Sequence, residues 1–318
     1  MIHTGAIFIK EGGTACMKTA KRKGASKLER KEWLAGYLFL LPNFIGFLIF
    51  SAAPVVMGFI ISLTDYTGFG KANFVGIQNY IQMFKDSNFR ISFQNNLFYT
   101  FTSVPLTILF SMVLALMLNR KLYGGDVFKT IYFFPNLTSM VAVGCVWLQL
   151  FEPKAGPVNQ ILNSLGIQNT PKWFWAASTA LISIVIVVVW KQAGYYMIMF
   201  LGGLKNIPAH LYESAKMDGA TSWQTFRYIT WPMLSPTTFM VTILTFIASF
   251  QVFDIINVTT EGGPGRATTV LVMRIYKEAF GYGRMGYASA MGYFLFLIIF
   301  LITLVQWKAQ SKWVCDDM

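Results

Sequence analysis

The stretch Ile207-Pro-Ala-His-Leu-Tyr-Glu-Ser-Ala-Lys-Met-Asp-Gly-Ala220 opens a polar segment that lies between two long apolar runs. Pro208 suits the first position of a helix, because its missing N–H has no intrahelical partner there. Gly219 suits the left-handed residue that closes a helix. Thr221 and Gln224 match a capping box that begins another helix. We therefore predict two short helices joined at Gly219. A connection between apolar runs does not need such complete capping, so the segment is a candidate docking surface.

The apolar runs on either side belong to a chain dominated by hydrophobic residues. Of its 318 residues, 55% are hydrophobic and 13% are charged, and the mean hydropathy is +0.50. Soluble domains carry roughly 25% charged residues, so the main solvent of this chain is lipid. A membrane-spanning helix needs about 20 predominantly apolar residues. Five of six charge-free stretches reach that length, and the fourth reaches it by continuing past Lys191 to Leu204. The six stretches are residues 33–64, 91–119, 130–151, 173–190, 228–253 and 285–307. We expect an all-α integral membrane protein with six transmembrane helices.

The net charge of +12 is concentrated before the first span. Eight Lys and Arg residues precede Trp33, and such a cluster beside a first span places the N-terminus in the cytoplasm. With six spans the C-terminus is cytoplasmic too. We divide the chain into a basic cytoplasmic tail, residues 1–32, and a six-helix transmembrane domain, residues 33–318, with a cytoplasmic loop at about 205–236. Nucleic acid is not an expected partner, because the sequence has no compact basic fold or interleaved aromatic platform.

Three connecting segments then face the outside, at residues 65–90, 152–172 and 257–284. The first is turn-rich and of mixed polarity, which predicts a short folded cap. The second contains an amphipathic helix at about 158–165, and the third an amphipathic stretch at 268–280. The first apolar run is about thirty residues long, more than the 7–15 of a signal-peptide core, so we interpret it as a retained span.

The sequence contains no motif for the chain's own catalysis. It has no Gly-x-x-x-x-Gly-Lys-Ser/Thr phosphate loop, no His-Glu-x-x-His and no Gly-x-Ser-x-Gly. Cys16, Cys145 and Cys315 are odd in number and widely spaced, which fits neither a disulfide framework nor a metal site. We expect no catalytic residue, no metal and no bound cofactor, so any energy for transport has to come from a partner.

Lys191 and Asp254 are the charged residues that fall within or beside the spans, Asp254 near the outer end of the fifth. Ion-coupled carriers place carboxylates or histidines at membrane depth, whereas His3 and His210 lie outside the spans. Lys191 either extends its ammonium toward the cytoplasm, as long basic side chains do, or lines an aqueous pathway. Both residues are candidates for a translocation pathway.

Three runs in and around the cytoplasmic segment resemble the EAA loop of membrane subunits of binding-protein-dependent ABC importers. They are residues 201–208, 211–220 and 226–232, in which Ser214 and Gly202 stand where that family usually has alanine. Further runs are similar to the carbohydrate-uptake, maltose-type branch of the same family. These are residues 36–42, 74–80, 253–264, 268–271, 275–276 and 286–290. The resemblance covers nearly the whole chain.

The resemblance implies a type I ABC importer permease fold in a bacterial-type cytoplasmic membrane. It implies that the 205–236 loop is a coupling helix that fits a cleft on a cytoplasmic ATPase. The implied docking residues are Pro208, Leu211, Tyr212, Glu213, Ser214, Ala215, Asp218, Gly219 and Ala220. The implied partners are a second homologous permease subunit, two ATPase subunits that use ATP and Mg²⁺, an extracytoplasmic solute-binding protein and membrane lipid. The implied cargo is a sugar, an oligosaccharide or a polyol derivative.

Two alternatives stay open on the residues themselves. Glu213 and Asp218 either pair with a basic partner surface or only cap and solubilise a loop. A channel or secondary carrier for a small polar solute, working without any ATPase, is the alternative function.

Overall fold

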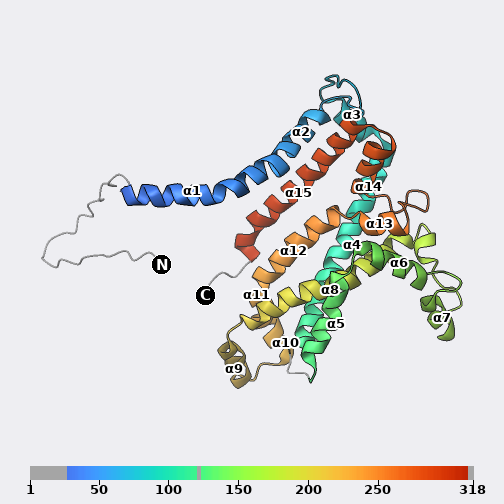
Figure 1. The fold of residues 1–318 in the computed structure, drawn as a ribbon. Coiled ribbons are helices and arrows are strands. Elements are labelled where there is room, and N and C mark those ends of the chain that lie inside the picture. The colour runs from blue at the N-terminus through green and yellow to red at the C-terminus, as the bar shows by residue number, and fades with distance from the viewer. Residues whose placement is uncertain (1–26, 120–122, 314–318) are drawn as a thin grey trace. The chain divides into compact units, whose positions relative to one another are not determined.

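The computed structural model describes residues 27–119 and 123–313, so most of the predicted tail 1–32, together with Cys16 and Cys315, lies outside the described residues. Figure 1 shows the helices in chain order. Their bounds are α1 Lys27–Phe47, η1 Leu48–Ala52, α2 Ala53–Ser62, α3 Gln78–Lys85, α4 Ser87–Leu118, α5 Gly125–Leu137, α6 Met140–Leu150, α7 Pro157–Ser164, η2 Trp173–Trp175, α8 Ala180–Lys205, α9 Ala209–Met217, α10 Ser222–Thr225, η3 Phe226–Thr230, α11 Trp231–Met233, α12 Ser235–Phe250, α13 Asp254–Thr259, α14 Leu271–Tyr276, η4 Lys277–Gly281 and α15 Met285–Trp313. In the part of the chain that is described, strand pairing is limited to one antiparallel bridge between Thr64 and Phe74.

The chain divides into two units, the first ending at Val55 and the second beginning at Val56. The described part of the first unit consists of α1, the π-helix η1 and the start of α2. Pro54 lacks the N–H that would bond the carbonyl four residues earlier, and the wider π turn lies directly before it. Large apolar side chains of this unit are exposed, Phe39 to 87% and Phe50 to 81%. Such a surface suits a lipid environment.

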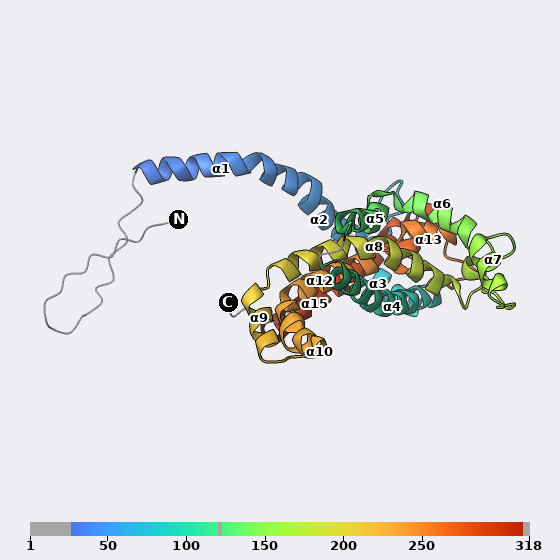
Figure 2. The same cartoon turned by 90° about the horizontal axis from the view of Figure 1, so that it is seen from below.

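The centre of the second unit is the packing of α4 against α8, with α12 and α5 beside them (Figures 1 and 2). The buried face of α4 is rich in small and hydroxyl-bearing residues, which allow membrane helices to approach closely. One contact crosses to α12, where the Ser249 hydroxyl donates to Thr100 Oγ1 at 3.0 Å. Ser92, Asn96, Thr100, Ser103, Thr107 and Ser111 form this face.

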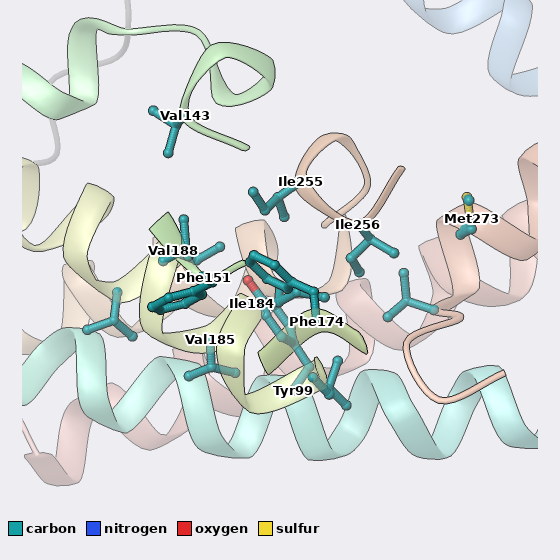
Figure 3. Packing of buried hydrophobic residues seen from close by; sticks show 14 residues of the cluster. Tyr99, Val143, Phe151, Phe174, Ile184, Val185, Val188, Ile255, Ile256 and Met273 are labelled. Atoms are coloured by element: carbon teal, nitrogen blue, oxygen red, sulfur yellow. The ribbon is translucent and has the colours of Figure 1, made fainter. Parts of the chain in front are cut away.

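A second part of the core gathers apolar side chains from α4, α6, α8, α13 and α14. Figure 3 shows Phe151 and Phe174 among aliphatic side chains of α8 and of α13. Phe151 also stacks on Trp173, with ring centroids 4.2 Å apart and planes within 7°. These contacts attach the segment 152–172 to the end of the unit that holds α13.

The predicted spans are confirmed as helices, but two of them are strongly bent. Among the described residues four helices are long and apolar enough to cross a membrane, and two bent pairs raise the number to six if each pair is one span. The pair α5 and α6 bends by 101° between Leu137 and Met140. The helix that ends at Met233 and α12 meet at 63°. Pro135 lies in the last turn of α5, just before the first bend, and Pro236 is the second residue of α12, just after the second bend. Neither proline has the backbone N–H that an uninterrupted helix would use.

The fourth span begins later than the sequence predicts. Trp173 has φ of +44° and lies in a short 3₁₀ turn, so α8 starts only at Ala180. Of the predicted amphipathic elements, the helix at 158–165 is α7, and the stretch 268–280 contains α14 and η4.

Helices α5 and α8 approach closely at Gly194. A Cβ placed on Gly194 would lie 1.8 Å from the carbonyl oxygen of Tyr132. Glycine at this position therefore lets the two backbones touch. Gly202, eight residues along α8, has nothing within 4 Å of the same position.

The segments 65–90 and 257–284, both predicted to be outside, are joined by a buried ionic network. Glu278 is fully buried and forms ion pairs with both Arg274 and Arg284. Arg274 also contacts Asp86, whose Oδ2 accepts from the Tyr287 hydroxyl at 3.0 Å. Burial alone would raise the pKa of Asp86. The backbone N–H of Asn88, the Tyr287 hydroxyl and Arg274 together hold that pKa below its usual value.

Candidate functional site

The candidate docking segment begins one residue later than the sequence predicts. Helix α9 starts at Ala209, and Pro208 is the N-cap with an extended ψ of 131°. The prediction of Pro208 as the first helical residue is therefore wrong. The reason for expecting proline here still applies at the N-cap, because an N-cap residue needs no N–H bond within the helix. The Pro208 carbonyl accepts from the Leu211 N–H at 3.2 Å.

The prediction of a left-handed Gly219 that closes α9 is confirmed. Gly219 has φ of +74°. Its N–H donates to the Lys216 carbonyl at 3.2 Å, and the Ala220 N–H donates to the Ala215 carbonyl at 2.9 Å. These are the two bonds of a Schellman motif, which satisfies the last carbonyls of a helix.

The predicted capping box at the start of α10 is also confirmed. The Thr221 hydroxyl oxygen accepts from the Gln224 backbone N–H at 3.3 Å, and the Thr221 N–H donates to Gln224 Oε1 at 2.7 Å. Both sides of the turn at Gly219 are thus fixed by hydrogen bonds. The turn holds α9 and α10 in one defined arrangement.

The structure divides the expected docking residues between two faces of α9. Glu213, Ser214, Asp218 and Gly219 are exposed, and Ala215 is buried. Pro208, Leu211, Tyr212 and Ala220 are half-buried, and Leu211 and Tyr212 pack against an apolar cluster of their own chain. The exposed face is the part of the segment that a partner can reach.

Two large side chains join this exposed face although the sequence analysis did not include them. Met217 is 82% exposed and Trp223 is 70% exposed. Both flank the capped turn at Gly219. The sequence did contain a sign of their role, because both are large apolar residues within a polar, well-capped segment. Aromatic and methionine side chains are enriched at surfaces where proteins bind one another. We call Glu213, Ser214, Met217, Asp218, Gly219 and Trp223 the exposed coupling face.

Figure 1 shows α9 and α10 at the end of the second unit that is opposite to α3 and α14. The segments predicted to be cytoplasmic and outside are thereby separated along the length of α4 and α8.

Lys191 and Asp254, the two pathway candidates, have different surroundings. Lys191 is 8% exposed and its ammonium donates to the Asn136 carbonyl at 3.3 Å, at the end of α5. A cation there also faces the negative end of the α5 dipole. Asp254 is exposed at the first residue of α13. In the described part of the chain, no hydrogen bond or ion pair joins the two side chains.

Metal-binding groups are not clustered in residues 27–119 and 123–313, where no three His, Cys, Asp or Glu side chains lie close enough to hold an ion. Cys145 is exposed, with a free thiol.

Residues 93–308 match the family described as binding-protein-dependent transport system inner membrane component. The chain belongs to this family. The permease is also similar along most of its length to named transport proteins. It is 34% identical to the trehalose/maltose transport system permease protein MalF of Thermococcus litoralis, over 89% of this chain and 96% of the relative. It is 33% identical to the lactose transport system permease protein LacF of Rhizobium radiobacter, over 90% and 97%. It is 32% identical to the arabinooligosaccharides transport system permease protein AraP of Bacillus subtilis, over 92% and 94%.

The fold of the permease is also found in a solved transporter. It matches a chain of the bacterial alginate ABC transporter in complex with alginate pentasaccharide-bound periplasmic protein, with a TM-score of 0.79 and 26% identity. The match covers 90% of this chain and 96% of that one. The expected type I ABC importer permease fold is therefore confirmed, and the permease is a multi-pass membrane protein of a transport family.

Proposed function

We propose that this permease is one transmembrane subunit of an ATP-driven importer for a sugar, oligosaccharide or polyol derivative. A solute-binding protein outside the cytoplasmic membrane delivers the cargo, and separate ATPase subunits, which bind ATP and Mg²⁺, supply the energy. The exposed coupling face is the observation that carries this proposal. It is a rigid, doubly capped projection that presents charge and large apolar side chains away from its own chain.

The chemistry of the exposed coupling face suits a cleft on another protein. Small Ser214 and Gly219 allow close approach, while Glu213 and Asp218 offer carboxylates to a basic partner surface. Met217 and Trp223 supply apolar area, which is the usual source of affinity at the centre of an interface. A capped, pre-ordered segment also loses little conformational entropy on binding.

The cargo and the remaining partners are supported by the relatives. MalF, LacF and AraP are named for trehalose and maltose, lactose, and arabinooligosaccharides. The solved alginate transporter is bound to a periplasmic protein that carries a pentasaccharide. By analogy the segments 65–90, 152–172 and 257–284 face the binding protein, and a second homologous permease subunit completes the pathway. Both termini then lie in the cytoplasm. Lys191 and Asp254 remain candidates for that pathway.

The test is purification of the complex with its ATPase and binding protein, followed by solute uptake in proteoliposomes. Asp218→Arg reverses a charge of the exposed coupling face and is expected to abolish ATPase retention and uptake together. Asp126→Arg is the matched control, because the Asp126 side chain is 96% exposed and lies outside the capped segment. ATP hydrolysis should rise with binding protein loaded with an oligosaccharide and not with an amino acid.

Uptake that survives Asp218→Arg, or a wild-type chain that transports its solute with no ATPase bound, would overturn the proposal. The second result would favour the channel or secondary carrier.

A further inference from the structure

Tyr212 belongs to α9 but points into its own chain. Its ring is half-buried and packs against the apolar cluster that includes Leu204, Ile207 and Leu234. Its hydroxyl lies 3.2 Å from the Thr230 hydroxyl. The ring and the hydroxyl of Tyr212 both contact its own chain, which favours a role inside the permease over a role in ATPase contact.

Thr230 lies near the start of α12, the longest helix of the fifth span. It is 5% exposed and ends the π-helix η3, and only α11 and Leu234 separate it from α12. Its hydroxyl also donates to the Thr225 carbonyl at 3.5 Å. The Thr230 oxygen is then free to accept from Tyr212, so a short chain of hydrogen bonds runs from α9 into the backbone of α10.

The bond between Tyr212 and Thr230 joins residues 18 positions apart in the sequence, and the whole capped turn lies between them. The Schellman motif and the capping box fix the internal shape of that turn. They do not fix how the turn as a whole is seated on the start of the fifth span. The part-buried pair of hydroxyls does so, together with the apolar contacts of Leu211 and Tyr212.

We propose that Tyr212 and Thr230 are positioning residues that latch the coupling helix to the fifth span. A displacement of the exposed coupling face by a bound partner then moves α9, η3, α11 and α12 together as one rigid body. Without this bond, α9 could rotate separately from the fifth span. This inference rests on the proposed function, in which the ATPase causes that displacement. It assigns Tyr212 to transmission inside the permease and not to the contact with the ATPase.

The residue types support a specific role for the two hydroxyls. Phenylalanine at 212 would keep the ring packing, and valine at 230 would keep the shape of threonine. Tyr212→Phe removes only the hydrogen bond between the two hydroxyls, whereas Thr230→Val also removes the bond to the Thr225 carbonyl. Such a bond has a net value of about 1 kcal/mol, so its loss raises the population of unlatched helix by about fivefold.

The experiment uses the complete reconstituted complex and counts ATP molecules hydrolysed per solute imported. Tyr212→Phe and Thr230→Val are each expected to raise this ratio by up to about fivefold while the ATPase still co-purifies. The double variant should be no worse than Thr230→Val alone, because Tyr212→Phe removes a bond that Thr230→Val has already removed. Thr230→Ser keeps the hydroxyl and should restore the wild-type ratio. Tyr228→Phe is the matched control, since Tyr228 lies in the same π-helix and is 74% exposed.

Each outcome bears on one proposal. A wild-type ratio in both single variants, or effects of the two that add, would overturn the latch while leaving the docked ATPase in place. Failure of the wild-type chain to hold an ATPase would instead overturn the proposed function. A lower thermal stability with an unchanged ratio would also count against the latch, because it indicates a structural bond without a part in transmission.

Discussion

Replacing Gly194 by alanine tests the close contact between α5 and α8. The added Cβ would lie 1.8 Å from the Tyr132 carbonyl oxygen, whereas ordinary contacts begin at 3.4 Å. Helix α5 would have to retreat by about 1.6 Å, and a backbone cannot rotate away as a side chain can. Overpacking of this kind costs roughly 1–3 kcal/mol, and we take the upper end because the obstacle is backbone. The better helix propensity of alanine returns about 1 kcal/mol. The net expectation is a loss of about 2 kcal/mol.

The assay is thermal unfolding of the purified permease in detergent, with amide hydrogen exchange along α5. Gly194→Ala should lower the melting temperature and speed exchange near Tyr132. Gly202→Ala is the matched control on the same helix, because its added Cβ meets nothing within 4 Å, and it should be neutral or stabilising. Equal melting temperatures for the two variants would refute the close approach of α5 and α8.

Three further predictions concern the ionic network and the capped turn. Glu278→Gln leaves Arg274 and Arg284 without their shared carboxylate and should cost about 3–5 kcal/mol of unfolding free energy, measured by thermal unfolding in detergent. Glu213→Gln is the exposed control and should cost almost nothing in the same thermal unfolding measurement. Thr221→Ala removes the N-cap of α10 and should cost about 1 kcal/mol, read as faster amide exchange from Thr221 to Gln224 that Ser222→Ala does not reproduce. Because the pKa of folded Asp86 is lowered, its stabilisation is complete above the usual value of 3.8 and disappears as pH falls through the lower folded value. An acid titration of stability should therefore be flatter for Asp86→Asn, and an unchanged titration would contradict the role given to Arg274 and Tyr287.

The turn at Gly219 was predictable because its determinants are local. The left-handed glycine and the Thr221–Gln224 box act over a few residues, so the sequence contains all their partners. The two faces of α9 were also predictable from the sequence, since the spacing of Leu211, Tyr212 and Ala215 places them on one side of a helix. The motif resemblance grouped both faces together, and only the packing against the fifth span separates them.

The bends and the buried network were not predictable in the same way. The length of a charge-free stretch shows whether it is apolar but not whether its helix is straight. The 101° bend after Leu137 therefore could not be predicted from hydropathy. Arg274 and Glu278 are four residues apart, a spacing that a helix pairs. Asp86, however, meets Arg274 across 188 residues of sequence, and only the tertiary fold brings them together.

The capped turn between α9 and α10 also sets how this loop can change in length. Surface loops usually accept insertions, because their backbone groups bond to water. Here, consecutive residues 219–221 each donate their N–H to a fixed partner within the turn. One extra residue would break that pattern and change the direction in which the exposed coupling face points. Epitope tags, fluorescent fusions and natural insertions should therefore be tolerated poorly at residues 215–224, although most of these residues are exposed to solvent.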